Sequence, residues 1–419
     1  MINKSENNKI INTLILVLLL FCLMRFSLVI TFNLPLFSLT YVILVLFLVV
    51  FYYAVIGFSF RNQFFGINLL FLFACILLVG LSYLLTENSE YSKTVSVYLK
   101  QLLVLVLLWG LYVFLLNCSK RTAKICVVFY LVCIAISSVY TAFVAFVGGD
   151  NIIRFTASGK YDNSFPFMYG GFDFIFALVL IYTVILTTLR FLWRQLSIFT
   201  RVLLVCFEML MALTIIVSGY GTAFALILIF TLWQLRPKGF VGTIIFLSLL
   251  LVVLIIPRIV TSMIDAIPFI PDLTSTRINE MILLISGRGS SGYLFDDGQR
   301  FDRIGWSLKI LGENPLFGGF IGDTKLPFGY HTEWIDQLAR YGFFFALFNA
   351  AFWVLTYRVI KRNADETDAS DISGKCIKNS FLMFIILGFL DPISMVVTAC
   401  PLFILSPFAF RIFNKKEIV

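Results

Sequence analysis

The chain has 419 residues and a formal net charge of +9, yet only 13% of its residues are charged while 60% are hydrophobic. Soluble domains carry about 25% charged residues, so this composition excludes an ordinary soluble domain. It indicates an all-α polytopic membrane protein surrounded by a lipid bilayer. No nucleic acid is expected as a partner.

Twelve apolar stretches approach the roughly 20 residues that a helix needs to cross a bilayer. They are residues 10–32, 36–59, 64–85, 95–116, 124–147, 172–190, 200–218, 219–235, 240–256, 341–360, 377–392 and 395–412. The eighth follows its predecessor directly, and Asp391-Pro392 and Pro401 interrupt the last pair. About twelve transmembrane helices are therefore expected, with eleven as the alternative.

The basic residues give these spans a direction. If the N-terminus lies in the cytoplasm, the inner segments hold most of the Lys and Arg residues near span ends, as the positive-inside rule requires. Both termini are then cytoplasmic. Residues 10–32 are expected to be a span rather than a cleaved signal peptide, because the run is long, contains Arg25 and lacks a small-residue cleavage site.

This topology divides the chain into three parts. Residues 1–256 hold nine spans with an outer loop at 148–171, and residues 257–340 form a large extracytoplasmic loop. Residues 341–419 hold three spans and a cytoplasmic loop at 361–376. The large loop is expected to carry short amphipathic helices and the catalytic groups.

The sequence gives little support for a metal site or a nucleotide-binding site. None of the eight cysteines falls in the large loop, and the chain has one histidine, so neither a disulfide framework nor a transition-metal cluster is expected there. Asp296-Asp297 is either a solvated turn or a contact for a hard cation. No GxxxxGK[ST] phosphate loop occurs. We expect no metal and no cofactor.

Three charged residues, Arg25, Lys100 and Glu208, lie well inside predicted spans. Lys100, like Arg25, lies in the outer part of its span, where it either reaches the headgroups or helps to bind a lipid-linked anion. Glu208 lies mid-span, and an acid there is a functional candidate. A structural salt bridge, with Lys100 as the partner, is the alternative.

Residues 300–342 are the longest polar stretch with regular structural signals. Ile304, Leu308 and Leu311 recur at helical spacing, which predicts an amphipathic surface helix over 300–311. Asn314-Pro315 and several glycines then break regular structure until His331, the single histidine. Thr332 is the predicted N-cap of a second helix with Glu333 in its first turn.

Arginine dominates among the cations of the large loop, with six arginines and two lysines. Planar guanidinium groups bind phosphate with two hydrogen bonds at once. Arg288, in a glycine- and serine-rich segment, either binds an anion or belongs to a flexible lid. Arg154, in the first outer loop, is either a substrate contact or ordinary loop chemistry.

The order of these motifs resembles the shared signature of bacterial O-antigen polymerases and O-antigen ligases. An arginine-bearing helix precedes Glu-Asn-Pro-Leu-Phe-Gly-Gly, and His331 then opens a helix that runs into a span, over about forty residues. The resemblance implies an enzyme of the bacterial cytoplasmic membrane. Such an enzyme uses undecaprenyl-diphosphate-linked oligosaccharides on the outer face without metal, and a chain-length regulator is a conceivable protein partner.

The resemblance also implies roles for individual residues. His331 would be the base for the attacking hydroxyl, because an unperturbed imidazole accepts a proton at neutral pH. Arg300 and Arg303 would bind the diphosphate, with Arg288 or Arg154 assisting. From composition alone, His331 reads instead as a polar residue at a helix start.

Three functions stay open at this point. A repeat-unit polymerase is favoured over a ligase, because Ser218-Gly219-Tyr220-Gly221-Thr222 lacks the arginine of the ligases' outer turn. Thr332 also stands where many ligases have asparagine. A transporter or flippase is the third, since twelve spans with both ends inside is also a carrier arrangement.

Overall fold

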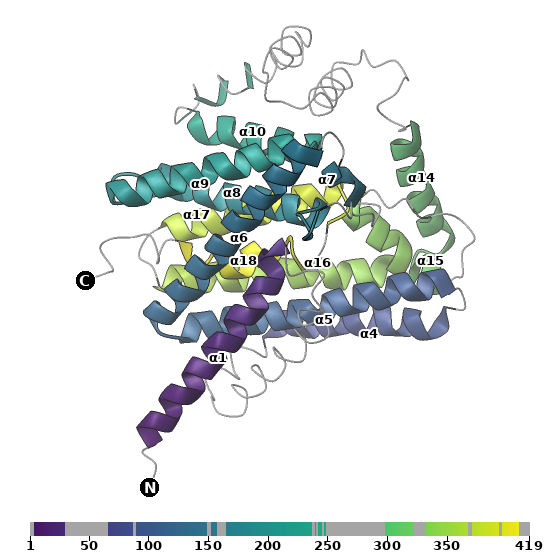
Figure 1. The fold of residues 1–419 in the computed structure, drawn as a ribbon. Coiled ribbons are helices and arrows are strands. Elements are labelled where there is room, and N and C mark those ends of the chain that lie inside the picture. The colour runs from purple at the N-terminus through teal and green to yellow at the C-terminus, as the bar shows by residue number, and fades with distance from the viewer. Residues whose placement is uncertain are drawn as a thin grey trace.

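The computed structural model describes residues 4–29, 66–86, 89–148, 152–156, 165–236, 239, 242–244, 247–248, 298–321, 328, 332–367, 371–393 and 396–409. Its elements (Figure 1) are α1 (Lys4–Ser27), α4 (Ile67–Leu85), α5 (Ser89–Asn117), α6 (Lys120–Gly148), α7 (Ile152–Phe155), α8 (Phe172–Leu192), α9 (Ile198–Val217), α10 (Gly221–Leu235), α14 (Gly298–Glu313), α15 (Gly318–Ile321), α16 (Glu333–Thr367), α17 (Asp371–Leu390) and α18 (Cys400–Ile404). Seven of them, α4, α5, α6, α8, α9, α16 and α17, are long and apolar enough to cross a membrane. The chain is a multi-pass membrane protein whose described part is helical without strands.

These seven helices coincide with seven of the predicted spans. The 219–235 prediction corresponds to α10, which has 15 residues, and the 10–32 prediction to α1, whose apolar part is Leu16–Ser27. The predicted span 36–59 and most of 240–256 lie outside the described residues. The count of twelve therefore stays a prediction.

The last predicted span, 395–412, is not one continuous helix. Its described part, residues 396–409, holds the five-residue α18 between turns, and all of it is buried. Pro401 stands in the first turn of α18, where its missing N–H costs nothing, but it would interrupt a longer helix. The stretch is apolar because it packs among α5, α8 and α17, not because it faces lipid.

Hydrogen bonds between helices join the bundle. Asn68 on α4 donates to Thr356 on α16 at 3.2 Å, and Asn379 on α17 donates to Thr187 on α8 at 3.1 Å. Thr214 on α9 donates to the Ser138 carbonyl on α6 at 3.2 Å. In a membrane such bonds add to van der Waals packing, which is otherwise the main attraction between helices. The most buried span is α8, which contacts α9, α10, α17 and α18.

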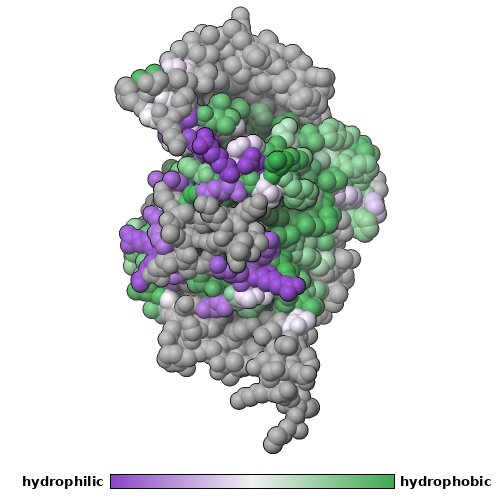
Figure 2. All heavy atoms as spheres, turned by 90° about the vertical axis from the view of Figure 1, so that its left-hand side faces the viewer, coloured by the Kyte–Doolittle hydropathy of each residue, from purple (hydrophilic) through white to green (hydrophobic). Residues whose placement is uncertain are grey.

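One end of the bundle, the cationic end, collects basic residues at helix termini. Polar contacts join neighbouring termini there, including Arg190 with Gln234 and Asn363 with Tyr112. Figure 2 looks onto this end and shows the hydrophilic residues gathered over it. The basic residues are Lys120, Arg121, Lys124, Arg190, Arg194, Arg201, Arg236, Arg358, Lys361, Arg362, Lys375 and Lys378. All twelve come from segments predicted to be cytoplasmic.

The opposite end, the loop end, carries α7, α14, α15 and the start of α16 (Figure 1). The predicted helix over 300–311 is confirmed by α14, which extends to Gly298 and Glu313. It runs across the direction of the spans rather than along it (Figure 1). Ser307 and Ile310 are fully buried on one face while Leu308 and Lys309 are exposed, as a surface helix requires.

The two ends predict opposite reactivity toward a membrane-impermeant amine reagent. Lys309 on α14 and Lys120 and Lys378 at the cationic end are all exposed. In intact cells we expect the reagent to modify Lys309 and to spare Lys120 and Lys378, which become reactive after permeabilisation. Peptide mass spectrometry identifies the modified lysines. The reverse pattern would place α14 in the cytoplasm and exclude the predicted orientation.

Candidate functional site

The start of α16 is tied to α14 by one carboxylate. Asp336 accepts a hydrogen bond from Ser307 Oγ at 2.6 Å through Oδ1, and from the Thr332 backbone N–H at 3.0 Å through Oδ2. Both side chains of the Ser307–Asp336 bond are buried. A typical intramolecular hydrogen bond stabilises by about 0.5–1.5 kcal/mol. This pair therefore fixes α14 against α16.

Thr332 occupies the predicted N-cap position, but its side chain does not cap the helix. Its carbonyl accepts the Asp336 N–H at 3.0 Å. Its buried hydroxyl has no hydrogen-bond partner among the described residues. Asp336, a residue that the capping pattern did not single out, satisfies the Thr332 N–H instead.

A chain of buried polar side chains continues from this point into the membrane part of α16. Gln337 donates to the Glu333 carboxylate, and Asn349 donates to Gln337 Oε1 at 2.8 Å. The Glu333 N–H reaches the Asp391 carbonyl at the end of α17, 3.4 Å away. The sequence predicts Glu333 in the first turn of this helix, where the helix dipole favours an acid. Glu333 is also buried and hydrogen bonded.

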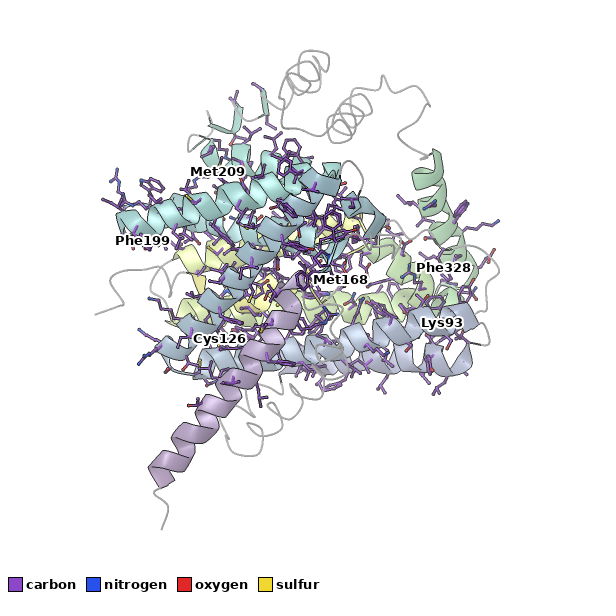
Figure 3. The ribbon with its side chains drawn as sticks, in the orientation of Figure 1. Lys93, Cys126, Met168, Phe199, Met209 and Phe328 are labelled. Carbon is purple, nitrogen blue, oxygen red and sulfur yellow. The ribbon has the colours of Figure 1, made fainter. Side chains whose placement is uncertain are left out.

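Arg340 and Tyr98 complete the group, here called the polar cap: Tyr98, Ser307, Thr332, Glu333, Asp336, Gln337 and Arg340. Arg340 interacts electrostatically with Glu333, and both interact with the hydroxyl of Tyr98 on α5. Tyr98 stacks on Tyr341 with ring centroids 5.2 Å apart. Beneath it, Phe328, labelled in Figure 3, meets Phe320 at 4.8 Å.

The Asn314-Pro315-Leu316-Phe317-Gly318 turn docks on a break in α16 at Gly342. The N–H groups of Phe343 and Phe344 lose their helical partners there and donate to the carbonyls of Pro315, at 2.8 Å, and Leu316, at 3.5 Å. Gly318 and Gly342 both have φ near +80°, at 76° and 79°. A Cβ on either would overlap the opposite backbone. We call these contacts the glycine clasp. Through them the backbone of the Asn314–Gly318 turn binds the backbone of α16.

The predicted diphosphate-binding residues are partly described. Arg303 is half-buried and lies one turn before Ser307 on α14. Arg300 lies one turn earlier in α14, and Arg154 lies in α7, but their side chains are outside the described residues. His331 and Arg288 are also outside them; His331 directly precedes Thr332.

Glu208 and Lys100 are not brought together. Glu208 is buried on α9, which packs against α6, α8 and α10. Lys100 is exposed on α5. Neither carboxylate oxygen of Glu208 has a hydrogen-bond partner among the described residues. The salt bridge considered for this pair is therefore not formed.

An apolar groove between α16 and α17 begins beside the polar cap. Its volume is about 560 Å³. Gln337 and Asn349 bring the polar chain to its wall, and exposed side chains such as Val354 and Leu382 leave it accessible from the membrane. Its lining comprises Trp334, Ile335, Gln337, Leu338, Ala346, Asn349, Ala350, Trp353, Val354, Tyr357, Lys378, Phe381, Leu382, Ile385 and Phe389. We call it the α16–α17 groove.

Comparison with known proteins assigns the chain to no family. No protein-family model matches the chain, and no curated protein matches it either. Among the described residues, no three His, Cys, Asp or Glu side chains are grouped so that they could hold a metal ion.

The glycine clasp predicts a stability difference between glycines. Gly318→Ala and Gly342→Ala place a Cβ in the left-handed region and against backbone, so each is expected to destabilise the protein by about 1–3 kcal/mol. Gly305→Ala, in open space on α14, is the control and is expected to be neutral or slightly stabilising. Thermal unfolding in detergent measures the melting temperatures of the three variants. Equal melting temperatures for all variants would contradict the clasp.

Proposed function

We propose that the chain polymerises undecaprenyl-diphosphate-linked oligosaccharide repeat units on the outer face of the bacterial cytoplasmic membrane. The transfer needs no metal. The observation that carries this proposal is the Ser307–Asp336 bond, because it fixes the helix that bears Arg300 and Arg303 against the residue that follows His331. The proposed mechanism requires His331 and the guanidinium groups of Arg300 and Arg303 to act together at that end of the bundle.

The reaction requires two tasks. An acceptor hydroxyl oxygen attacks the anomeric carbon of the donor while the bond from that carbon to the diphosphate oxygen breaks. His331 takes the hydroxyl proton, and the diphosphate leaves with the electron pair. Arg303 and Arg300 offset the charge that develops on the diphosphate.

The α16–α17 groove supports a lipid-linked donor over a soluble one. It lies between two spans, begins at Trp334 and Gln337 beside the polar cap, and continues to Lys378 near the cationic end. A polyprenyl chain can lie in such an apolar groove while its diphosphate stays at the membrane surface. Because the groove is accessible from the membrane, van der Waals contact rather than removal of apolar surface from water would hold the chain there.

A carrier without chemistry is the second candidate, and Glu208 favours it. An acid inside a membrane span is common where ions or protons are moved. The polar cap argues the other way, because a carrier places its binding site near the bilayer midplane rather than at one end of the bundle.

The proposal predicts loss of polymerisation in defined variants. Purified protein and lipid-diphosphate oligosaccharide should yield a ladder of products on a sizing gel. His331→Ala should lower the rate by about 10²–10⁴-fold, and Arg303→Ala should lower it by more than Arg303→Lys does. Lys309→Ala, on the exposed face of the same helix, is the control and should leave the rate unchanged.

Each alternative gives a different result. Product that forms only with an added lipid or protein acceptor indicates a ligase. Absence of any product, with lipid-linked sugar moved between leaflets, indicates a carrier. Full activity of His331→Ala removes the base from this mechanism.

The groove predicts a change in donor affinity. Ala350→Trp fills the groove, so it should raise KM for a long-chain polyprenyl donor while leaving kcat and the KM of a short-chain analogue nearly unchanged. Leu347→Trp, on the exposed side of α16 and away from the lining, is the matched control. Steady-state kinetics with both donors tests this. Equal effects on both donors would show that the groove does not bind the polyprenyl chain.

A further inference from the structure

Glu208 is a buried acid that the proposed transfer does not use. It lies midway along α9, next to Met209, which Figure 3 labels. Its side chain is 8% exposed, and it makes no hydrogen bond or ion pair with any described residue. A carboxylate without a counter-charge is very costly in the membrane interior. The physically favourable form is therefore the neutral acid.

The helices around α9 offer no counter-charge at this depth among the described residues. On α6, Cys133 faces Ser27 and Tyr130 faces Cys400. Lys124 of α6 and Arg190 of α8 lie toward the cationic end, and α10 contains no ionisable residue. On α9 itself, Arg201 lies over the Trp193 ring at 5.3 Å, two turns before Glu208. Within the described part of the chain, Tyr182 of α8 is the ionisable side chain that interacts electrostatically with Glu208.

Tyr182 begins a line of polar groups between α8 and α10. Its hydroxyl shares a hydrogen bond of 2.7 Å with Thr231 Oγ1. One turn further along α10, the buried Gln234 accepts from Arg190 at 2.9 Å. Arg190 also reaches the Arg236 carbonyl at 3.5 Å. We call Tyr182, Thr231, Gln234 and Arg190 the polar seam. It leads from the depth of Glu208 to the cationic end.

We propose that Glu208 is a proton-binding site inside the membrane, and that it exchanges its proton with the cationic side along the polar seam. On release, Glu208 gives its proton to a bridging water, which passes one to the Tyr182 hydroxyl. Tyr182 passes its own proton to Thr231, and Thr231 passes one to water that enters from the cationic side. Uptake is the reverse, so each hydroxyl keeps one proton and no electron transfer is required. The site is separate from the polar cap, which lies at the other end of the bundle. Protonation of Glu208 couples the packing of α8, α9 and α10 to the pH at the cationic side.

Infrared difference spectroscopy of the full-length protein in lipid tests the proposal without any sugar substrate. The wild-type protein should show the C=O stretching band of a protonated carboxyl at neutral pH, and Glu208→Gln should remove that band. Transfer to D₂O should shift the band. The rate of this shift should fall on the order of tenfold in Tyr182→Phe, the effect of one lost hydrogen bond.

Thr183→Val is the matched control for the seam. Thr183 is the next residue on α8 and is buried, and its hydroxyl donates to the Val179 carbonyl of its own helix at 2.8 Å. Loss of this hydroxyl should leave the exchange rate unchanged. A band that persists in Glu208→Gln overturns the site. Equal exchange in Tyr182→Phe and wild type overturns the seam.

A second measurement covers the case in which Glu208→Gln does not fold. A hydrophobic carbodiimide adds the O–H of a protonated carboxyl across its C=N bond, and the adduct rearranges to a stable N-acylurea. Wild-type protein should carry this adduct at Glu208, located by peptide mass spectrometry. Its absence at neutral pH overturns the proposal. Neither experiment depends on polymerisation, so failure of one proposal leaves the other standing.

Discussion

The arrangement of the loop end depends on the two backbone N–H groups that the break in α16 leaves free. An unsatisfied backbone donor costs several kcal/mol inside a membrane. The carbonyls of Pro315 and Leu316 satisfy these donors, and the two backbones approach closely only because both facing residues are glycines. The turn is thereby held on α16, and α14 is held there too because the turn follows it directly. The position of Arg303 relative to the start of α16 follows from this contact together with the Ser307–Asp336 bond.

Buried acids at the two depths of the bundle have opposite surroundings. Glu333 and Asp336 lie at the loop end, where amide, hydroxyl and backbone donors meet their oxygens. Glu208 lies mid-span without such donors among the described residues. The first arrangement orients groups and holds a shape. The second arrangement is a buried acid without hydrogen-bond donors, which is unfavourable and contributes little to stability.

Much of the membrane architecture could be predicted from the sequence, because length, hydropathy and charge act locally. The seven long helices and the amphipathic helix over 300–311 follow from such patterns. The sequence predicted a membrane span over 395–412, because burial among helices and exposure to lipid select the same apolar residues. The Gln337–Asn349 bond and the Ser307–Asp336 bond could not be predicted, since each joins residues whose proximity exists only after folding. The proposed roles of His331, Arg288 and Arg300 stay predictions.

The central position of α8 has a consequence for how the chain assembles. Its neighbours α17 and α18 come from the last part of the sequence, about two hundred residues later, and Asn379 of α17 meets Thr187 there. Until they arrive, a ribosome-bound intermediate presents buried threonines of α8 to lipid or to the insertion machinery. A nascent bundle therefore stays open along that side of α8 until α17 and α18 have been synthesised.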